Sequence, residues 1–209
     1  MTSADADLLN FSAHARVLLS LTAIAWLAFA LNFGNWLTRL FALRPRNLWG
    51  LLGIPLSPFL HANMQHLTGN TSAFLPLAWF VMLQGIHVFY VVTIGTVLGS
   101  GILTWLLGRA KAYYVGASDL IYGYQGFLLI YGIIAGNWIA LLLAAVSIYL
   151  YGKALTGYTV RFGSKEFTAA SGILPNSDVP NLAWESHLFG FVVGGLLAYL
   201  LGVMKLDHY

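Results

Sequence analysis

The chain has 209 residues, of which 59% are hydrophobic and only 8% are charged. Soluble domains carry about 25% charged residues, so this composition excludes a disordered chain and an ordinary soluble globule and indicates an integral membrane protein. Ten Lys and Arg against seven Asp and Glu give a net charge of +3, too sparse for a nucleic-acid-binding surface. Because the chain has no cysteine, it has no disulfide framework, thiolate metal site or thiol nucleophile.

Uncharged runs separated by polar turns predict six membrane-spanning helices, since about 20 apolar residues cross a hydrocarbon core as a helix. The uncharged run 47–108 is too long for one helix and breaks at the polar residues 84–87. The run 120–152 breaks at 136–137, where Trp138 follows as an interface anchor. The predicted spans are 17–33, 66–83, 88–107, 118–135, 138–151 and 186–204.

The segments outside the spans are predicted from their polarity and their helix breakers. Residues 1–15 are expected to form a polar tail, loose or interfacial, and 39–60 an apolar interfacial loop rich in Pro and Gly. Residues 153–185 are expected to form a mobile extramembrane loop. A tail at 206–209 leaves 16–205 as one membrane domain, and six spans place both termini on the same side of the membrane.

Polar residues at the start of the second span form a first cluster, in a setting where polar side chains are costly and usually functional. His66 and Asn70 are four residues apart and share one helix face, with His61 just upstream. The simplest alternative is a pair of interfacial histidines beside a helix cap. His61 and His66 are five apart and no carboxylate lies near them in sequence, so we predict no metal site.

A second cluster opens the fourth span with Gly116, Ser118, Asp119 and Tyr122. A Gly-x-Ser turn that leads into a helix can hold a hydroxyl near free backbone N–H groups. With 22 glycines in the chain the motif alone is a weak signal, and Ser118 could simply be the N-cap of the helix.

A third cluster begins the last span. His187 opens an apolar helix in which Gly190 and Gly194 form a small-x-x-x-small pattern, which permits close approach of another helix. Gly123 and Gly126 offer complementary small residues on the fourth span. The alternative is an interfacial histidine followed by a packing motif without a chemical role.

The three clusters are predicted to converge because the second, fourth and sixth spans run in the same direction. A serine, a histidine base and a His/Asn pair that can donate hydrogen bonds to an oxyanion are the parts of an acyl-transfer site.

Taken together, these residues resemble the rhomboid family of intramembrane serine proteases. The resemblance extends from about Val17 to Met204. The family's His-x4-His-x3-Asn pattern on the second helix, its Gly-x-Ser motif with a tyrosine four residues later, and its His-x2-Gly-x3-Gly pattern on the last helix all occur, in this order. The matching residues are His61, His66, Asn70, Gly116, Ser118, Tyr122, His187, Gly190 and Gly194.

The resemblance implies an all-α membrane protein, a six-transmembrane-helix rhomboid-like bundle, with serine endopeptidase activity. Ser118 would be the nucleophile and His187 the general base of a catalytic dyad, with Tyr122 stacked on the imidazole. Gly190 and Gly194 would let the last span pack close enough to the fourth for the Ser–His hydrogen bond.

The resemblance also implies an oxyanion hole formed by His66, Asn70 and the backbone N–H of Ser118, with His61 lining a polar cavity that admits water. The expected substrates are proteins with a transmembrane helix, cut in or near the membrane. No cofactor and no nucleic acid are expected, and the lipid bilayer is the other partner.

Two features depart from the family's pattern. Asp119 stands where the residue after the serine is usually Gly, and no Trp-Arg dipeptide precedes His61. We expect Asp119 to bond free N–H groups in the first turn of the helix, with Arg109 or Lys111 neutralising it from the preceding loop.

Two other functions remain open. Asp119 supports a weak or inactive rhomboid-like protein that binds transmembrane helices without cleaving them. A small transporter is a further alternative, but paired carboxylates and repeats, which transporters often carry, are missing from the sequence.

The resemblance implies a multi-pass protein of a bacterial inner membrane with both termini in the cytoplasm. With that topology only Arg16 and Lys205 of the ten basic residues would lie inside, contrary to the positive-inside rule. We favour the family's topology because the predicted inner turns, near Gly85 and Asn137, are too short to carry charge.

Overall fold

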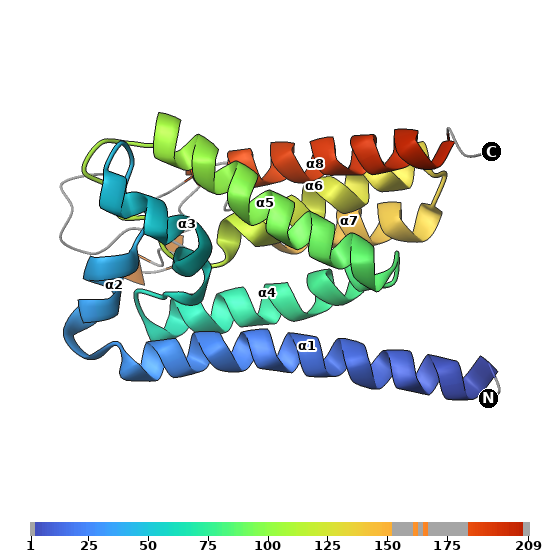
Figure 1. The fold of residues 1–209 in the computed structure, drawn as a ribbon, viewed down its shortest axis with the longest axis horizontal. Coiled ribbons are helices and arrows are strands. Elements are labelled where there is room, and N and C mark those ends of the chain that lie inside the picture. The colour runs from blue at the N-terminus through green and yellow to red at the C-terminus, as the bar shows by residue number, and fades with distance from the viewer. Residues whose placement is uncertain (1–2, 152–160, 163–164, 167–183, 207–209) are drawn as a thin grey trace.

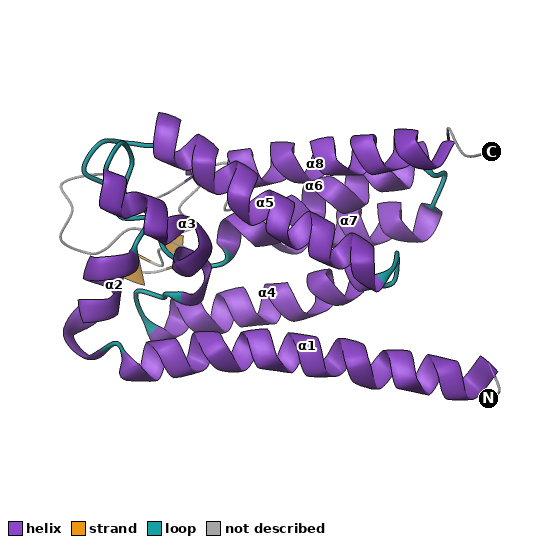
Figure 2. Ribbon diagram, viewed as in Figure 1, coloured by secondary structure: helices purple, strands orange, loops and turns teal. Residues whose placement is uncertain are grey.

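A computed structural model describes residues 3–151, 161–162, 165–166 and 184–206. The described part is built almost entirely from helices, and the long helices run along one axis of the molecule (Figures 1 and 2). The α-helices are α1 (Ser3–Leu31), α2 (Trp36–Phe41), α3 (Gly53–Leu56), α4 (Met64–Met82), α5 (Ile86–Leu107), α6 (Ser118–Ile134), α7 (Trp138–Tyr151) and α8 (Trp184–Leu206). The shorter elements are the 3-10 helices η1 (Phe33–Asn35), η2 (Leu48–Leu52) and η3 (Ser57–Phe59) and the strands β1 (Arg161–Phe162) and β2 (Lys165–Glu166).

Each predicted span coincides with one long helix, and the ends agree within a few residues except at the N-terminus. The start of α1 and the end of α8 lie at the same end of the molecule, as an even number of crossings requires (Figure 1). The tight turns between α4 and α5 and between α6 and α7 occur where the polar breaks predict them. Gly85 and Gly136 have positive φ there (125° and 59°), which a residue with a side chain rarely adopts.

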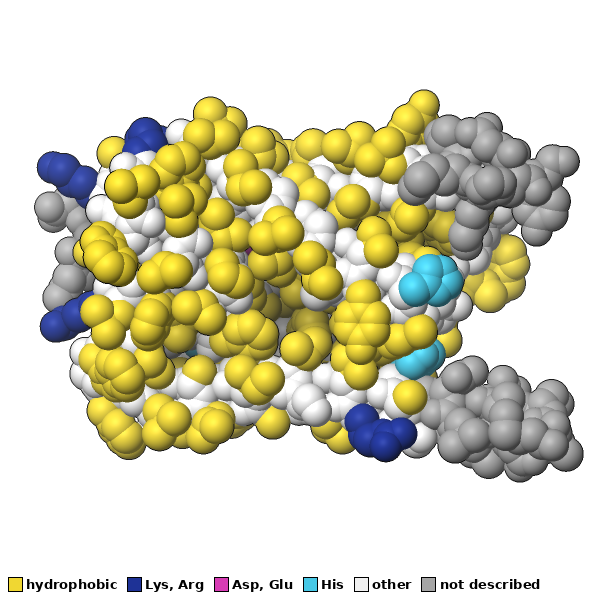
Figure 3. Space-filling view, viewed as in Figure 1, with side chains coloured by type: hydrophobic (Ala, Val, Ile, Leu, Met, Phe, Trp, Pro, Cys, Tyr) yellow, Lys and Arg dark blue, Asp and Glu magenta, His cyan; other side chains and the backbone are white. Residues whose placement is uncertain are grey.

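Three of the described helices are long and apolar enough to cross a membrane: Phe11–Leu31, Ile86–Leu107 and Trp184–Gly202. The remaining predicted spans are shorter or more polar, since α6 has 17 residues, α7 has 14, and α4, with 19, carries His66 and Asn70. Hydrophobic side chains cover the face in Figure 3, and basic side chains lie near its two ends. The protein is therefore an all-α membrane bundle. That six helices cross the membrane remains a prediction.

The structure differs from the predicted N-terminal tail. Residues 1–15 were expected to be loose or interfacial, but α1 already begins at Ser3 and continues without a break to Leu31. The physical reason is local helix propensity: this segment is rich in alanine and leucine, including Ala4, Ala6, Leu8 and Leu9, and both residue types are strong helix formers.

The predicted interfacial loop at 39–60 is folded into short helical turns that include η2, α3 and η3. Leu48 and Trp49 are exposed on it, and its position at the membrane surface stays a prediction. The predicted extramembrane loop at 153–185 lies mostly outside the described residues. Its described part contains β1 paired with β2 in an antiparallel ladder of two residues each, a small exception to the all-α prediction.

Helix α6 occupies the centre of the bundle, and α8 packs on it with almost no side chains between the two backbones. A Cβ on Gly190 would overlap the carbonyl oxygen of Asp119, and a Cβ on Gly194 would overlap that of Gly123. From the other side, a Cβ on Gly126 would overlap the carbonyl oxygen of Phe191. The predicted small-residue contact between the fourth and sixth spans is therefore present, and it brings the first turns of α6 and α8 together.

We expect Gly194→Val to lower the thermal stability of the purified protein, because the new side chain must push α8 away from the α6 backbone. Gly69→Val is a matched control: Gly69 is also helical, but no atom lies within 4 Å of a Cβ placed on it. Thermal unfolding in detergent should show a lower midpoint for Gly194→Val than for Gly69→Val. Equal midpoints would contradict the close-packing argument.

Candidate active site

The loop before α6 is held from both sides by backbone hydrogen bonds. Leu43 and Tyr114 exchange N–H···O bonds of 3.1 and 2.9 Å, and the N–H of Gly116 donates to the carbonyl of Ser57 at 2.9 Å. Gly116 has φ of +104°, and a Cβ there would collide with the side chains of His66 and Asn70. Only glycine satisfies both conditions, so this loop delivers Ser118 to the start of α6 from a defined position.

Ser118 and His187 form a direct hydrogen bond. His187 Nε2 lies 2.9 Å from Ser118 Oγ, and both residues are buried, with Ser118 6% and His187 0% exposed. The N-cap of α6 is Ala117 rather than Ser118, so the alternative interpretation of Ser118 as a capping serine is wrong. The hydroxyl of Ser118 contacts the imidazole, while its backbone N–H lies in the first turn, where no intrahelical acceptor exists.

Tyr122 lies one helical turn after Ser118 and packs against His187. The two ring centroids are 4.6 Å apart and the planes are inclined by 32°. Tyr122 is itself buried. The phenol ring therefore restricts the orientation of the imidazole on the side next to α6.

His66 and Asn70 project from one face of α4 toward Gly116, two residues before Ser118. Asn63 caps α4 by accepting the N–H of His66 at 2.8 Å. Both ring nitrogens of His66 and the amide nitrogen of Asn70 are buried, and they have no hydrogen-bond partner among the described residues. Unpaired buried donors are rare in proteins, and here they lie beside the loop that carries the serine.

His61 lies next to His66, with the two rings 5.1 Å apart in an edge-to-face arrangement. Its ring nitrogens are also buried and unpaired within the described part of the chain. His61 and Asn70 line a cavity of about 90 Å³ whose other walls are mostly apolar side chains of α1, α3, η3, α4, α5 and α6. The sequence-predicted residues of α4, α6 and α8 thus converge at one end of the bundle.

Asp119 points toward α5 and accepts hydrogen bonds from a hydroxyl and from a backbone N–H. Its Oδ2 accepts a hydrogen bond from Ser100 at 3.0 Å, and its Oδ1 accepts the N–H of Leu120 at 2.9 Å. The expectation that Arg109 or Lys111 neutralises Asp119 is wrong for Arg109, which forms an ion pair with Glu185. The contact with Leu120 does match the predicted use of free N–H groups in the first turn of α6.

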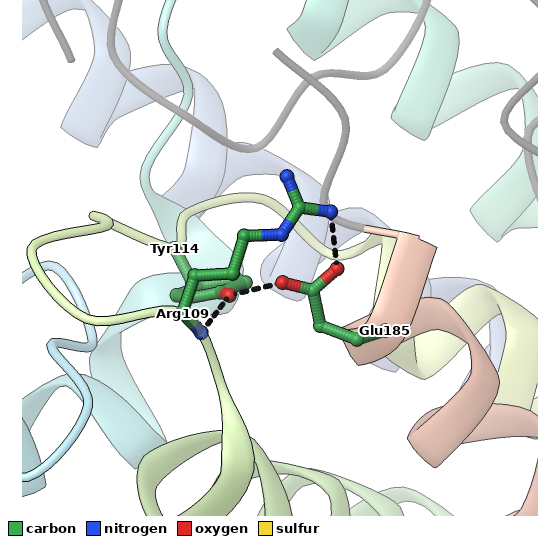
Figure 4. Close-up of polar contacts among 3 residues, drawn as sticks. All are labelled: Arg109, Tyr114 and Glu185. Atoms are coloured by element: carbon green, nitrogen blue, oxygen red, sulfur yellow. Dashed lines mark hydrogen bonds and ion pairs between the residues drawn. The ribbon is translucent and has the colours of Figure 1, made fainter. Parts of the chain in front are cut away.

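A second polar cluster joins the loop before α6 to the first turn of α8 (Figure 4). Arg109 Nη2 lies 2.7 Å from Glu185 Oε2, and the Tyr114 hydroxyl donates to Glu185 Oε1 at 2.5 Å. Sequence reasoning missed this cluster. Glu185 itself could have indicated the cluster, because an acidic residue at the start of an apolar span needs a partner of opposite charge or a hydrogen-bond donor.

Among the described residues, no group of three or more His, Cys, Asp or Glu side chains could hold a metal ion. The site contains a hydroxyl hydrogen-bonded to an imidazole, buried N–H donors beside this pair, and a phenol ring packed against the imidazole. This arrangement suits nucleophilic acyl transfer.

Comparison with known proteins gives a family for this fold. A family model described as a rhomboid domain matches residues 45–203. An uncharacterized protein of Mycobacterium tuberculosis is 32% identical over 164 residues, which cover 76% of this chain and 62% of that protein. An uncharacterized protein of Mycobacterium leprae is 32% identical over 157 residues, which cover 72% of this chain and 56% of that protein.

The chain thus spans only 56–62% of the length of these curated relatives, and neither relative has a stated activity. The family match, however, covers most of the chain and includes all three motifs that form the site, from His61 before α4 to Gly194 on α8. The chain therefore belongs to the rhomboid family.

Proposed function

We propose that the protein is an intramembrane serine protease that hydrolyses peptide bonds in or near the transmembrane helices of substrate proteins. The observation that carries this proposal is the buried hydrogen bond of 2.9 Å between Ser118 and His187. Unpaired buried donors on His66 and Asn70 support it, because a serine and a histidine alone would give a nucleophile without stabilisation of the charge that develops.

In the proposed reaction His187 accepts the proton of Ser118 as the hydroxyl oxygen attacks the carbonyl carbon of the scissile bond. The tetrahedral intermediate carries a negative oxygen, to which His66, Asn70 and the N–H of Ser118 donate hydrogen bonds. His187 then protonates the leaving amine, and an acyl-enzyme remains on Ser118. A water molecule, activated by His187, hydrolyses the ester and restores the serine.

Tyr122 has an orienting role in this proposal. With its ring centroid 4.6 Å from that of His187, it holds the imidazole edge toward Ser118. His61 would line the route by which water reaches the acyl-enzyme, since it borders the cavity beside Asn70. The protein itself and water supply every group in this proposal, so the proposed mechanism requires no cofactor.

The proposed partners are proteins with a transmembrane helix and the surrounding lipid bilayer. We further propose a multi-pass location in a bacterial inner membrane, with both termini on the cytoplasmic side. The apolar walls of the cavity next to His61 and Asn70 support a substrate that approaches from the membrane.

Ser118→Ala should abolish cleavage of a transmembrane test substrate and labelling by a fluorophosphonate, while the fold is retained. His187→Ala should be similarly inactive, because an unassisted serine hydroxyl is a poor nucleophile near neutral pH. Ser72→Ala, at an exposed serine of α4, is the matched control and should behave as wild type. Cleavage by purified Ser118→Ala would overturn the assignment.

Asn70→Ala and His66→Ala should each lower kcat without preventing acylation of Ser118. Loss of one oxyanion donor lowers kcat by about 10²–10³-fold in well-studied serine proteases, and less where several donors share the charge. Gln65→Ala, an exposed position on the same turn of α4, serves as control. If the His66→Ala, Asn70→Ala double variant cleaved at the wild-type rate, the oxyanion hole would have to lie elsewhere.

Asp119→Gly should be less stable than wild type, with activity changed by less than about tenfold. The carboxylate bonds to Ser100 and to the N–H of Leu120, so its loss weakens the first turn of α6 and a contact with α5. Ser100→Ala removes one of these bonds and should be destabilised to a smaller extent. Thermal unfolding and cleavage assays measure both effects.

The opposite outcome for Asp119 would change the functional conclusion. An increase in activity of about 100-fold or more in Asp119→Gly, which corresponds to about 2.7 kcal/mol of transition-state free energy, would mean that the carboxylate suppresses catalysis. The native chain would then fit better as a rhomboid-like protein that binds transmembrane helices without cleaving them.

A further inference from the structure

The carboxylate of Glu185 is buried and fully engaged at the start of α8. Its side chain is 9% exposed, its Oε2 lies 2.7 Å from Arg109 Nη2, and its Oε1 accepts the Tyr114 hydroxyl at 2.5 Å. The Tyr114 hydroxyl in turn accepts the backbone N–H of Arg109 at 2.9 Å. Figure 4 shows the three side chains meeting between the loop that follows α5 and the first turn of α8.

The cluster ties together the two elements that carry the dyad. Glu185 precedes His187 by two residues on α8, and Tyr114 precedes Ser118 by four residues in the loop before α6. The backbone of Tyr114 is itself held by two hydrogen bonds to Leu43. A displacement of the first turn of α8 would therefore have to break contacts with a loop that is anchored elsewhere in the protein.

We propose that Arg109, Tyr114 and Glu185 form a clamp that positions His187 against Ser118. The three are positioning residues: they act through the first turn of α8 and do not touch the reacting atoms. The inference rests on the proposed function, because it assigns the clamp a role in the Ser118–His187 dyad.

The physical need for such a clamp follows from where the glycine contacts begin. The first glycine of α8 that contacts the α6 backbone is Gly190, three residues after His187 and five after Glu185. The glycine contacts therefore fix α8 from Gly190 onward, and the first turn, which carries Glu185 and His187, has no glycine contact of its own. Terminal turns of helices lack half of their intrahelical hydrogen bonds and fray. A shift of about 1 Å would lengthen the 2.9 Å hydrogen bond of the dyad beyond useful range.

The chemistry of the three groups suits a permanent structural link. Burial, reinforced by the hydrogen bond to Glu185, raises the pKa of the Tyr114 hydroxyl above its ordinary value, so the phenol remains a donor. A hydrogen bond from a neutral donor to an ionised carboxylate is stronger than one between neutral groups. Arg109 supplies the opposite charge that a buried carboxylate requires.

The test measures the rate at which a fluorophosphonate labels Ser118, together with kcat and KM for a transmembrane substrate. Glu185→Gln keeps the side-chain size and removes its charge, and we expect labelling and kcat to fall by about tenfold or more while KM changes by less than about threefold. Tyr114→Phe should slow labelling by about threefold or more. The Glu185→Gln, Tyr114→Phe double variant should be labelled at a rate within about twofold of that of Glu185→Gln alone, because the two substitutions disrupt the same network.

Arg109→Gln and Lys111→Gln are a matched pair, since both remove a cation from the same loop, and Arg109 is the one that pairs with Glu185. Arg109→Gln should slow labelling and Arg109→Lys should restore much of the rate, while Lys111→Gln should match wild type. Labelling of a folded Glu185→Gln within about twofold of wild type would overturn the proposal, since a disrupted network should cost more than that. If Glu185→Gln does not fold, Tyr114→Phe decides: a wild-type labelling rate in that variant would overturn it.

These outcomes can be separated from failure of the proposed function. If the wild-type protein is not labelled at Ser118, or if Ser118→Ala still cleaves, the protease assignment fails and the clamp has no dyad to position. If the wild type is labelled and cleaves while the clamp variants do so at the same rate, only the clamp proposal fails.

Discussion

The close approach of α6 and α8 is the constraint on which the rest of the structure depends. Ser118 and His187 are 69 residues apart in sequence, and they meet at 2.9 Å because Gly190 and Gly194 let the two backbones come into contact. Between apolar helices in a bilayer the hydrophobic effect supplies no attraction, so backbone contact and van der Waals packing hold the pair. The same contact that stabilises the bundle therefore brings together the serine and the histidine that we propose as nucleophile and base.

The polar side chains at this end of the bundle are of two kinds, those with hydrogen-bond partners and those whose donors have none among the described residues. Asp119 and Glu185 are satisfied, the first by Ser100 and a backbone N–H, the second by Arg109 and a phenol. The donors of His66 and Asn70 have no partner among the described residues. An unpaired buried donor destabilises the fold, and the proposed function accounts for these donors, because the reacting oxygen of a substrate would be their acceptor.

Much of the fold and site followed from local pattern. Uncharged runs predicted the helices, and the spacing from His66 to Asn70 predicted a shared face of α4. The prediction of a loose tail at residues 1–15 was wrong, because α1 already begins at Ser3. The helix propensity of this segment outweighed its polar residues. It was also wrong for Arg109, which is close to Asp119 in sequence but pairs with Glu185, 76 residues away. Nearness along the chain does not determine ion pairing when two helices and a loop meet.

The sequence by itself determined that the chain is an apolar helical protein and, within a few residues, where each long helix after the first begins. It also determined that three of these helix starts carry polar groups suited to acyl transfer. The tertiary structure alone decided that Ser118 bonds to His187 instead of capping α6, that Asp119 turns toward Ser100, and that Glu185 is held by Arg109 and Tyr114. The physical reason is that a helix can be predicted from the spacing of residues close together in the sequence. A hydrogen bond between side chains, by contrast, forms or fails with changes of a few tenths of an ångström in distance, and only the packing of all the helices together sets that distance.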